Sequence, residues 1–317
     1  MRISVICPTY NEEKYIGDVI KFFISAKPAD KEFFIIDGGS LDKTREIVKE
    51  FCGSYPNIYL IDNPNRYVSF ALNLGIEKSH SDIIVRLDAH SKYSDDYFEK
   101  ILETFSEVDA DIVGGPYLTD FKSDFENAVG QAISTQFGIG NSKSHQANYK
   151  GYIDSVAFGA FKKKIFYEIG KFDERLVRNQ DDEFNYRANS FGKKVYQNPE
   201  IKFWYYPRSS LRTLFIQYFQ YGLYKPLVLQ KVKSESKLRH LIPSLFVLYL
   251  LILPLSIFSF WLTLPLAAYL LGLTLVSFTR KGRLKIKIIS LSIYPTIHIA
   301  YGIGFLFGLS KLKKLGK

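Results

Sequence analysis

The sequence predicts an α/β domain with a mostly parallel central sheet, followed by a C-terminal helical membrane region. Two observations lead to this fold class. Short apolar runs alternate with helix-like stretches over residues 2–87, which is the pattern of parallel βαβ units. Residues 241–279 contain no charged side chain, and an uncharged stretch of that length belongs in lipid.

The elements of the α/β part follow one another along the chain. Apolar runs predict strands at 2–7, 32–37, 58–62 and 82–87, and the stretches between them predict helices at 12–25, 42–51 and 69–79. Polar clusters follow these strands, and ligands bind at the carboxyl ends of strands in open α/β sheets. Beyond Asp111 we expect an apolar turn at 112–116, and the polar stretch 138–151 has the length of a mobile lid or binding loop.

Polar residues follow the first two strands in the runs Pro8-Thr9-Tyr10-Asn11-Glu12 and Asp37-Gly38-Gly39-Ser40-Leu41-Asp42. Carboxylates and hydroxyls at strand ends can accept hydrogen bonds from the ring N–H of a base and from ribose hydroxyls. An alternative of equal weight is that Asp37 and Ser40 only cap the next helix.

Two further acidic clusters carry possible chemistry. Asp88 and His90 lie two residues apart after a strand, so both can reach one divalent cation, Mg²⁺ or, with an imidazole ligand, Mn²⁺. The alternative is a solvated turn. In the run Asn179-Gln180-Asp181-Asp182-Glu183, a carboxylate can remove a proton from an acceptor hydroxyl. The alternative here is an acidic first turn favoured by the helix dipole.

Taken together and in this order, the clusters of residues 1–225 resemble the family-2 glycosyltransferases, which have the GT-A fold. Residues 8–12 match the family's opening motif, and residues 37–44 match its second nucleotide-binding motif. The resemblance implies a nucleotide-sugar donor and six nucleotide-binding residues: Pro8, Tyr10, Glu12, Asp37, Ser40 and Asp88. It also implies a cation on Asp88 and His90, and Asp181 as the catalytic base.

A closer likeness is to the bacterial exopolysaccharide branch, including the succinoglycan-type glucosyltransferases, through residues 85–91 and 178–185. Those enzymes are inverting and extend lipid-diphosphate-linked sugars at the cytosolic membrane face. Two positions depart from the family pattern. His90 replaces the usual second Asp, which bears on the identity of the metal, and Gln180 replaces the usual Glu.

Two arginines are candidates for binding the acceptor or its diphosphate. Arg187 lies downstream of the Gln180-Asp181 pair, and Arg208 precedes a stretch where processive relatives carry a Gln-x-x-Arg-Trp motif. The Arg and Trp of that motif are absent, which favours the addition of single sugars. Arg geometry suits a diphosphate, but Arg208 is equally well explained as an interfacial cation whose side chain snorkels.

The net charge of +10 is concentrated beside the apolar segments. The clustered basic residues are Lys225, Lys231, Lys233, Lys237, Arg239, Arg280, Lys281, Arg283, Lys285, Lys287, Lys311, Lys313, Lys314 and Lys317. This arrangement indicates anionic lipid head groups on the cytoplasmic leaflet and argues against a nucleic-acid partner. The two cysteines do not make a disulfide scaffold, and no signal peptide is recognised at the start, so we expect a cytosolic N-terminal domain.

The predicted domains are therefore a catalytic domain at 1–225, ending in an interfacial amphipathic helix at 211–224, and a membrane region at 226–317. Residues 241–279 are expected to form a helical hairpin with a turn near Trp261, and 288–309 either a third crossing or a buried re-entrant segment. The predicted protein is a multi-pass membrane glycosyltransferase with its catalytic domain in the cytoplasm and a lipid-linked or saccharide acceptor. The rival is a decayed, membrane-tethered nucleotide-binding or scaffold protein.

Overall fold

The protein is described by a computed structural model that covers residues 2–140, 144, 146–232 and 238–315. Contacts between residues divide it into two compact units, one of Met1–Leu118 with Lys143–Tyr205 and one of Thr119–Ser142 with Tyr206–Lys317. The sequence predicts one boundary after residue 225, whereas the second unit begins again at residue 206 and also includes residues 119–142. Several residues discussed above lie outside the described ones: Lys233, Lys237, Lys317, and positions 141–143 and 145 of the predicted loop.

The first unit is built on an eight-stranded sheet with the order β3-β2-β1-β4-β9-β6-β10-β8. Its strands are β1 (Ile3–Thr9), β2 (Lys31–Asp37), β3 (Ile58–Asp62), β4 (Ile83–Arg86), β6 (Ile112–Gly114), β8 (Gly151–Tyr152), β9 (Ala160–Lys162) and β10 (Val195–Gln197). The four strands from β3 to β4 are parallel, whereas β9 runs antiparallel to β4 and β6. A three-stranded sheet joins β5 (Ser91–Tyr93), β11 (Phe203–Tyr205) and β7 (Tyr117–Thr119).

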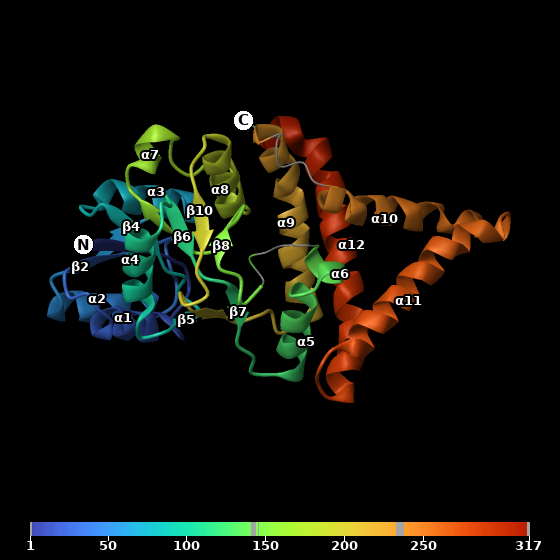
Figure 1. The fold of residues 1–317 in the computed structure, drawn as a ribbon, viewed down its shortest axis with the longest axis horizontal. Helices are drawn as coiled ribbons and strands as arrows, with labels where there is room; N and C mark the ends of the chain where they lie inside the picture. The colour runs from blue at the N-terminus through green and yellow to red at the C-terminus, as the bar shows by residue number, and fades with distance from the viewer. Residues whose placement is uncertain (1, 141–143, 145, 233–237, 316–317) are drawn as a thin grey trace. The chain divides into compact units, whose positions relative to one another are not determined.

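Helices cover both faces of the large sheet (Figure 1), which explains why its central strands are almost uniformly apolar. One face packs on α1 (Ile16–Ser25), α2 (Thr44–Ser54) and α4 (Tyr97–Glu107). The other packs on α3 (Val68–Lys78), α7 (Ile165–Glu168) and α8 (Gln180–Ser190). Alternate residues of β1 supply the two cores: Val5 faces the first and Ile6 the second.

The predicted strands and helices of residues 2–87 are all present, with two differences in this unit. The first helix begins at Ile16 rather than residue 12, because the backbone N–H groups of residues 11–13 donate to side chains of the loop after β2. The expected turn at 112–116 is wrong: residues 112–114 form β6, paired with β9 and β10. The sequence favours a turn there because the segment is short and contains two glycines, a composition that is more typical of turns than of strands.

The second unit is helical. It contains α5 (Asp124–Ile133), α6 (Gln136–Ile139), α9 (Leu211–Lys231), α10 (Ile242–Ile252), α11 (Leu264–Thr279) and α12 (Leu284–Leu315). The predicted amphipathic helix at 211–224 is thus the first part of α9, and it lies along α12 (Figure 1). Glycines bring the two backbones together: a Cβ on Gly222 would lie 2.1 Å from the Tyr301 carbonyl oxygen, and one on Gly304 2.1 Å from that of Phe219.

The segment 242–279 folds as two helical arms joined by short 3₁₀ turns, η4 (Leu253–Ile257) and η5 (Phe260–Thr263), so a helical hairpin is present. Figure 1 shows α10 and α11 meeting at the tip. Large apolar side chains are exposed there, including Ile257 at 81%, Phe258 at 82% and Trp261 at 74%. Two described stretches, Phe260–Thr279 and Leu284–Leu312, are long and apolar enough to cross a membrane.

Replacement of Gly304 by Ala should destabilise the helical unit. The new Cβ would overlap the Phe219 carbonyl oxygen, and overpacking of this kind costs about 1–3 kcal/mol. Gly272→Ala is the matched control, because its Cβ would meet only the Phe137 ring, at 3.2 Å, and a helix gains up to ~1 kcal/mol from Ala. Thermal unfolding in detergent should show a lower midpoint for Gly304→Ala than for the control. Equal midpoints would contradict this account of the α9–α12 contact.

Candidate functional site

The loops after β1 and β2 are bound to each other at the carboxyl edge of the sheet. Asn11 is central: its backbone N–H donates to Ser40 Oγ at 2.8 Å, and its side-chain oxygen accepts from Leu41 N–H at 2.8 Å. The backbone N–H of Glu12 donates to Thr44 Oγ1 at 2.7 Å. Asn11 adopts a left-handed φ of 55°, which Asn tolerates better than most residues. The two predicted nucleotide-binding runs therefore form one rigid structure.

Asp37 organises the second of these loops. Its Oδ2 accepts from the backbone N–H groups of Gly39 and Ser40, at 3.1 and 3.0 Å, and from Arg45 Nη1 at 2.7 Å. Its Oδ1 accepts from Ser40 Oγ. Gly39 has a φ of 81°, so the turn requires glycine there. The contacts with Gly39 and Ser40 stay within the loop: α2 begins at Thr44, its N-cap residue Lys43 has no side-chain cap, and so Asp37 and Ser40 shape the turn instead of capping the helix. The Asp37 side chain is fully buried.

An aromatic surface lies beside these loops. The Arg66 guanidinium lies 5.0 Å from the centroid of the Tyr10 ring, and the Arg66 carbonyl oxygen would be 2.9 Å from a Cβ on Gly38. Tyr10 is more than a third exposed. A partly exposed aromatic ring next to a cation can stack against a planar base, so Tyr10 and Arg66 have the chemistry of a base-binding surface.

Asp88 and His90, the predicted metal pair, lie in direct contact after β4. His90 Nδ1 is 3.0 Å from Asp88 Oδ1 and also 3.0 Å from Glu12 Oε1. The three side chains are between 19% and 27% exposed, so ligands can reach them. The structure thus brings Glu12, a predicted nucleotide residue, into the same cluster.

This cluster has the donor chemistry of a divalent-cation site. Two carboxylates and one imidazole suit Mn²⁺, and carboxylates suit Mg²⁺. Among the described residues, no three acidic, His or Cys side chains are arranged to enclose a metal. A cation of this kind often has only one or two protein ligands and is completed by substrate phosphates. The residues therefore fit a cation that binds together with a diphosphate.

Asp181 lies at the second residue of α8 and is bound by Arg86, the last residue of β4. Arg86 Nη1 donates to both carboxylate oxygens of Asp181. Asn179, with a left-handed φ of 62°, precedes the helix and turns the chain into it. The Asp181 side chain is 27% exposed, whereas that of Arg86 is 6% exposed. Asp181, the candidate general base, is thus accessible, while Arg86, its cationic partner, is buried.

Opposing effects act on the Asp181 carboxyl. Although part of the side chain faces solvent, burial raises its pKa, Arg86 lowers it, and the nearby Asp182 and Asp88 raise it, with a net increase. Burial lowers the pKa of Arg86, but Asp181 and Asp88 outweigh this effect, and the net pKa is raised. Arg86 accordingly stays cationic, and Asp181 is a stronger proton acceptor than an exposed aspartate.

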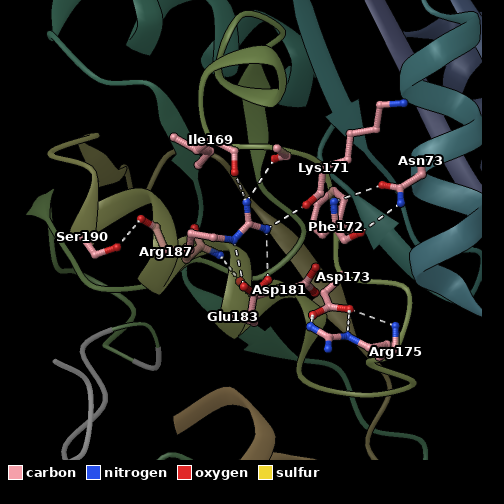
Figure 2. A network of polar contacts seen from close by, with 12 residues as sticks. Asn73, Ile169, Lys171, Phe172, Asp173, Arg175, Asp181, Glu183, Arg187 and Ser190 are labelled. Carbon is pink, nitrogen blue, oxygen red and sulfur yellow. Dashed lines mark hydrogen bonds and ion pairs between the residues drawn. The ribbon is translucent and has the colours of Figure 1, made fainter. Parts of the chain in front are cut away.

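Arg187 has all its donors in use (Figure 2). Nε and Nη2 donate to the buried Glu183 carboxylate at 2.8 and 3.1 Å, Nη1 to the carbonyl oxygens of Ile169 and Gly170, and Nη2 also to that of Lys171. An arginine has five N–H groups, and these are five contacts. A diphosphate would have to displace one of them. Arg187 thus holds the chain of residues 169–171 against α8.

The structure therefore unites most of the predicted site residues at one sheet edge. Pro8 and Thr9 end β1, Asp37 ends β2, and Asp88 and His90 follow β4. Arg208 lies in the helical unit. Sequence reasoning missed Arg86 and Arg66 as site residues. For Arg86 a signal existed, because a charged residue inside an apolar strand is rare unless paired.

Comparison with known sequences shows which protein family carries these site residues. The model of "Glycosyl transferase family 2" matches residues 4–170. The succinoglycan biosynthesis protein ExoA of Rhizobium meliloti (strain 1021) is 31% identical over 242 residues, which are 75% of this chain and 73% of the relative. A dolichyl N-acetyl-α-D-glucosaminyl phosphate 3-β-D-2,3-diacetamido-2,3-dideoxy-β-D-glucuronosyltransferase of Methanococcus voltae is 30% identical, covering 72% and 74% of the two chains.

Solved structures confirm the GT-A fold. The mannosyltransferase PcManGT from Pyrobaculum calidifontis, in complex with GDP-Man and Mn²⁺, has a TM-score of 0.61 at 15% identity and covers 97% of this chain and 87% of its own. Residues 1–349 of S. aureus TarS, in complex with UDP, give a TM-score of 0.53 at 13% identity, covering 100% and 92%. From the motif order, the fold and these relatives, we conclude that the chain belongs to glycosyl transferase family 2 and is a glycosyltransferase.

Proposed function

We propose that the protein moves a sugar, with inversion, from a nucleotide-sugar donor to a membrane-associated acceptor in exopolysaccharide or cell-surface glycan synthesis. The observation that carries the proposal is the accessible Asp181 carboxylate, connected through Arg86 to the strand that leads to Asp88. A proton acceptor and a cluster suited to a diphosphate thus adjoin one sheet edge. The related succinoglycan biosynthesis protein supports an exopolysaccharide product. The relative named for a dolichyl phosphate substrate supports a lipid-linked acceptor, which we propose carries a diphosphate.

The nucleotide would bind at the joined loops after β1 and β2. The base would lie on the Tyr10–Arg66 surface, and Glu12 and Asp88 would lie on the phosphate side. Asp37 and Ser40 would act here by shaping the turn that presents backbone groups to the nucleotide, with Pro8 ending the first strand. The complexes of similar folds with UDP and GDP-Man support a nucleotide-sugar donor, of which we favour a UDP-sugar.

The reaction would be one displacement. Asp181 accepts the proton of an acceptor hydroxyl, whose oxygen attacks the anomeric carbon from the side opposite the leaving group. The bond from that carbon to the nucleoside diphosphate breaks, and the diphosphate leaves with the electron pair. Asp88 and His90 would hold a divalent cation, Mn²⁺ or Mg²⁺, which supplies positive charge to the departing diphosphate.

Two arginines, Arg187 and Arg208, are candidates for binding the diphosphate of the acceptor. Arg208 is the better diphosphate candidate of the two predicted arginines, because Arg187 is held by Glu183 and three carbonyls. Loss of Arg208 charge would then raise the KM for a diphosphate-linked acceptor more than for a neutral saccharide. Arg187 would contribute indirectly, because it holds residues 169–171 against α8 through its bonds to their carbonyl oxygens and to Glu183.

We further propose that the helical unit anchors the enzyme in the cell membrane as a multi-pass protein, with residues 1–225 in the cytoplasm. The arms Ile242–Ile257 and Phe260–Thr279 measure about 26 and 32 Å, taking 1.5 Å per α-helical and 2.0 Å per 3₁₀ residue. Each arm is close to the ~30 Å of a hydrocarbon core. The exposed apolar tip and the basic residues from Arg280 to Lys287 support this topology.

Asp181→Asn should lower kcat by ~10² to 10⁴ while donor binding persists, because it removes the proton acceptor at almost constant volume. Asp182→Asn is the matched control: it lies next in the helix and contacts Ser155 Oγ at 3.3 Å instead of Arg86. Initial rates with a panel of UDP-sugars, together with donor binding by calorimetry, make the comparison. Turnover of Asp181→Asn at the rate of the control would remove Asp181 from the mechanism and favour the scaffold alternative.

His90→Ala should raise the Mn²⁺ concentration needed for half-maximal activity, because one ligand is lost from the cluster. His80→Ala serves as control, since His80 also pairs with a glutamate, Glu32, but lies before β4 at the opposite end of that strand. Titration of chelator-treated enzyme with Mn²⁺ and Mg²⁺ measures the effect. Full activity of the wild-type enzyme in EDTA would eliminate the cation from the proposal.

For the topology, single cysteines at Trp261 and Lys281 should react differently with an impermeant thiol reagent in intact cells, in a Cys52→Ser background. We expect labelling of Trp261→Cys from outside and labelling of Lys281→Cys only after lysis, because two crossings return the chain to the cytoplasm. Outside labelling of Lys281→Cys would refute the hairpin topology.

A further inference from the structure

Arg86 is a charged residue in a place that otherwise holds apolar side chains. It is the last residue of β4, whose other residues are Ile83, Ile84 and Val85, and it is 5% exposed. Its guanidinium carbon lies 4.9 Å from the centroid of the Phe158 ring. Burial of a guanidinium is costly unless an anion neutralises it. Among the described residues, Asp181 is the carboxylate to which it is hydrogen-bonded.

The position of this guanidinium is poor for stability alone. Arg86 Nε is buried and has no hydrogen-bond partner among the described residues. An unsatisfied buried donor costs about 1–3 kcal/mol, and native proteins contain few of them. The side chain thus gives up one hydrogen bond in order to direct Nη1 at both oxygens of Asp181.

The backbone is unusual on both sides of the pair. Phe158, against which Arg86 lies, has a φ of 48°, and Asn179, two residues before Asp181, has a φ of 62°. A positive φ is a real outlier for a bulky residue such as Phe, and such conformations cost about 1–3 kcal/mol each. The fold therefore fixes the surroundings of both the cation and the carboxylate.

The charges around Asp181 show what Arg86 does there. Asp88 follows β4, and Asp182 and Glu183 follow Asp181 in α8. Burial, Asp182 and Asp88 all raise the pKa of the Asp181 carboxyl, and Arg86 is the group that lowers it. Without Arg86, the effects that remain all favour the protonated acid, which cannot accept a proton.

We propose that Arg86 is a positioning residue that keeps the Asp181 carboxylate ionised and oriented to receive the proton of the acceptor hydroxyl. This inference rests on the proposed function, in which Asp181 is the base. In the transfer step the proton moves from the hydroxyl oxygen to Asp181, and Arg86 remains protonated throughout, as arginine does in proteins. Arg86 contacts no reacting atom in this scheme.

The test uses the full-length enzyme in detergent and the variants Arg86→Met and Arg86→Lys. Arg86→Met keeps a flexible side chain against Phe158 but loses the charge. An opposite charge lowers a carboxyl pKa by about 1–3 units, so the acid limb of kcat/KM should move to higher pH by that amount. At pH values below the limb, kcat/KM should fall by about ten- to a thousandfold, which is the effect of a 1–3 unit shift, while the donor KM stays within twofold. Arg86→Lys should return the limb towards its wild-type position.

Arg175→Met is the matched control, because it removes the same charge from an arginine that pairs with Asp173, a carboxylate with no role in the proposed reaction, and its acid limb should not move. An acid limb of Arg86→Met at the wild-type pH, in protein with a wild-type melting temperature, would overturn the inference. Should Arg86→Met not fold, Arg86→Lys decides: a limb shifted by a unit or more despite the retained charge would overturn it.

The outcome for Asp181→Asn separates this inference from the proposed function. Wild-type turnover of Asp181→Asn refutes Asp181 as the base, and the role of Arg86 falls with it. Loss of turnover in Asp181→Asn with an unmoved acid limb in Arg86→Met leaves the proposed function intact and refutes the inference alone.

Discussion

The site depends on the position of β1 between β2 and β4 in a parallel sheet. In this arrangement Thr9 is opposite Asp37, and Ile6 is opposite Arg86. Parallel strands end at the same edge, so three loops that are distant in sequence become neighbours. A shift of one residue in either register would turn the side chains of that strand to the other face. The apolar residues buried on both faces prevent such a shift. The packing of the core therefore fixes the positions of the loops that carry the site residues.

A second constraint is electrostatic. The carboxylates of Glu12, Asp88 and Asp181 gather near the sheet edge, and the charge of the nearby Asp88 is one of the causes that raise the pKa of Asp181. Buried Arg86 neutralises Asp181, and a cation brought with a diphosphate would neutralise Asp88. Removal of either positive charge leaves excess negative charge in a poorly solvated place, which is far more costly than the loss of an exposed ion pair. Binding and proton transfer are therefore linked through the same charges.

Sequence predicted the parallel strands and the apolar C-terminal helices, because these depend on local patterns of apolar, polar and turn-forming residues. It did not predict β6, where three residues pair with strands far along the chain. It also left the roles of Asp37 and Arg187 open. Those roles depend on tertiary contacts, since Arg187 binds carbonyl oxygens 16 to 18 residues away, and no local pattern encodes such distances.

Gly39 and Gly304 are required for different reasons in two different environments. In the loop after β2, Gly39 allows a left-handed turn around the Asp37 carboxylate, which is a polar requirement. Between α9 and α12, Gly304 allows two backbones to approach closely, as small residues do between helices packed within lipid. The hairpin that follows α9 exposes its largest apolar side chains instead of folding them inward. Water would oppose that arrangement at ~25 cal/mol per Å² of apolar surface, whereas a bilayer would favour it, so the exposed surface of these helices fits the membrane anchor that we propose.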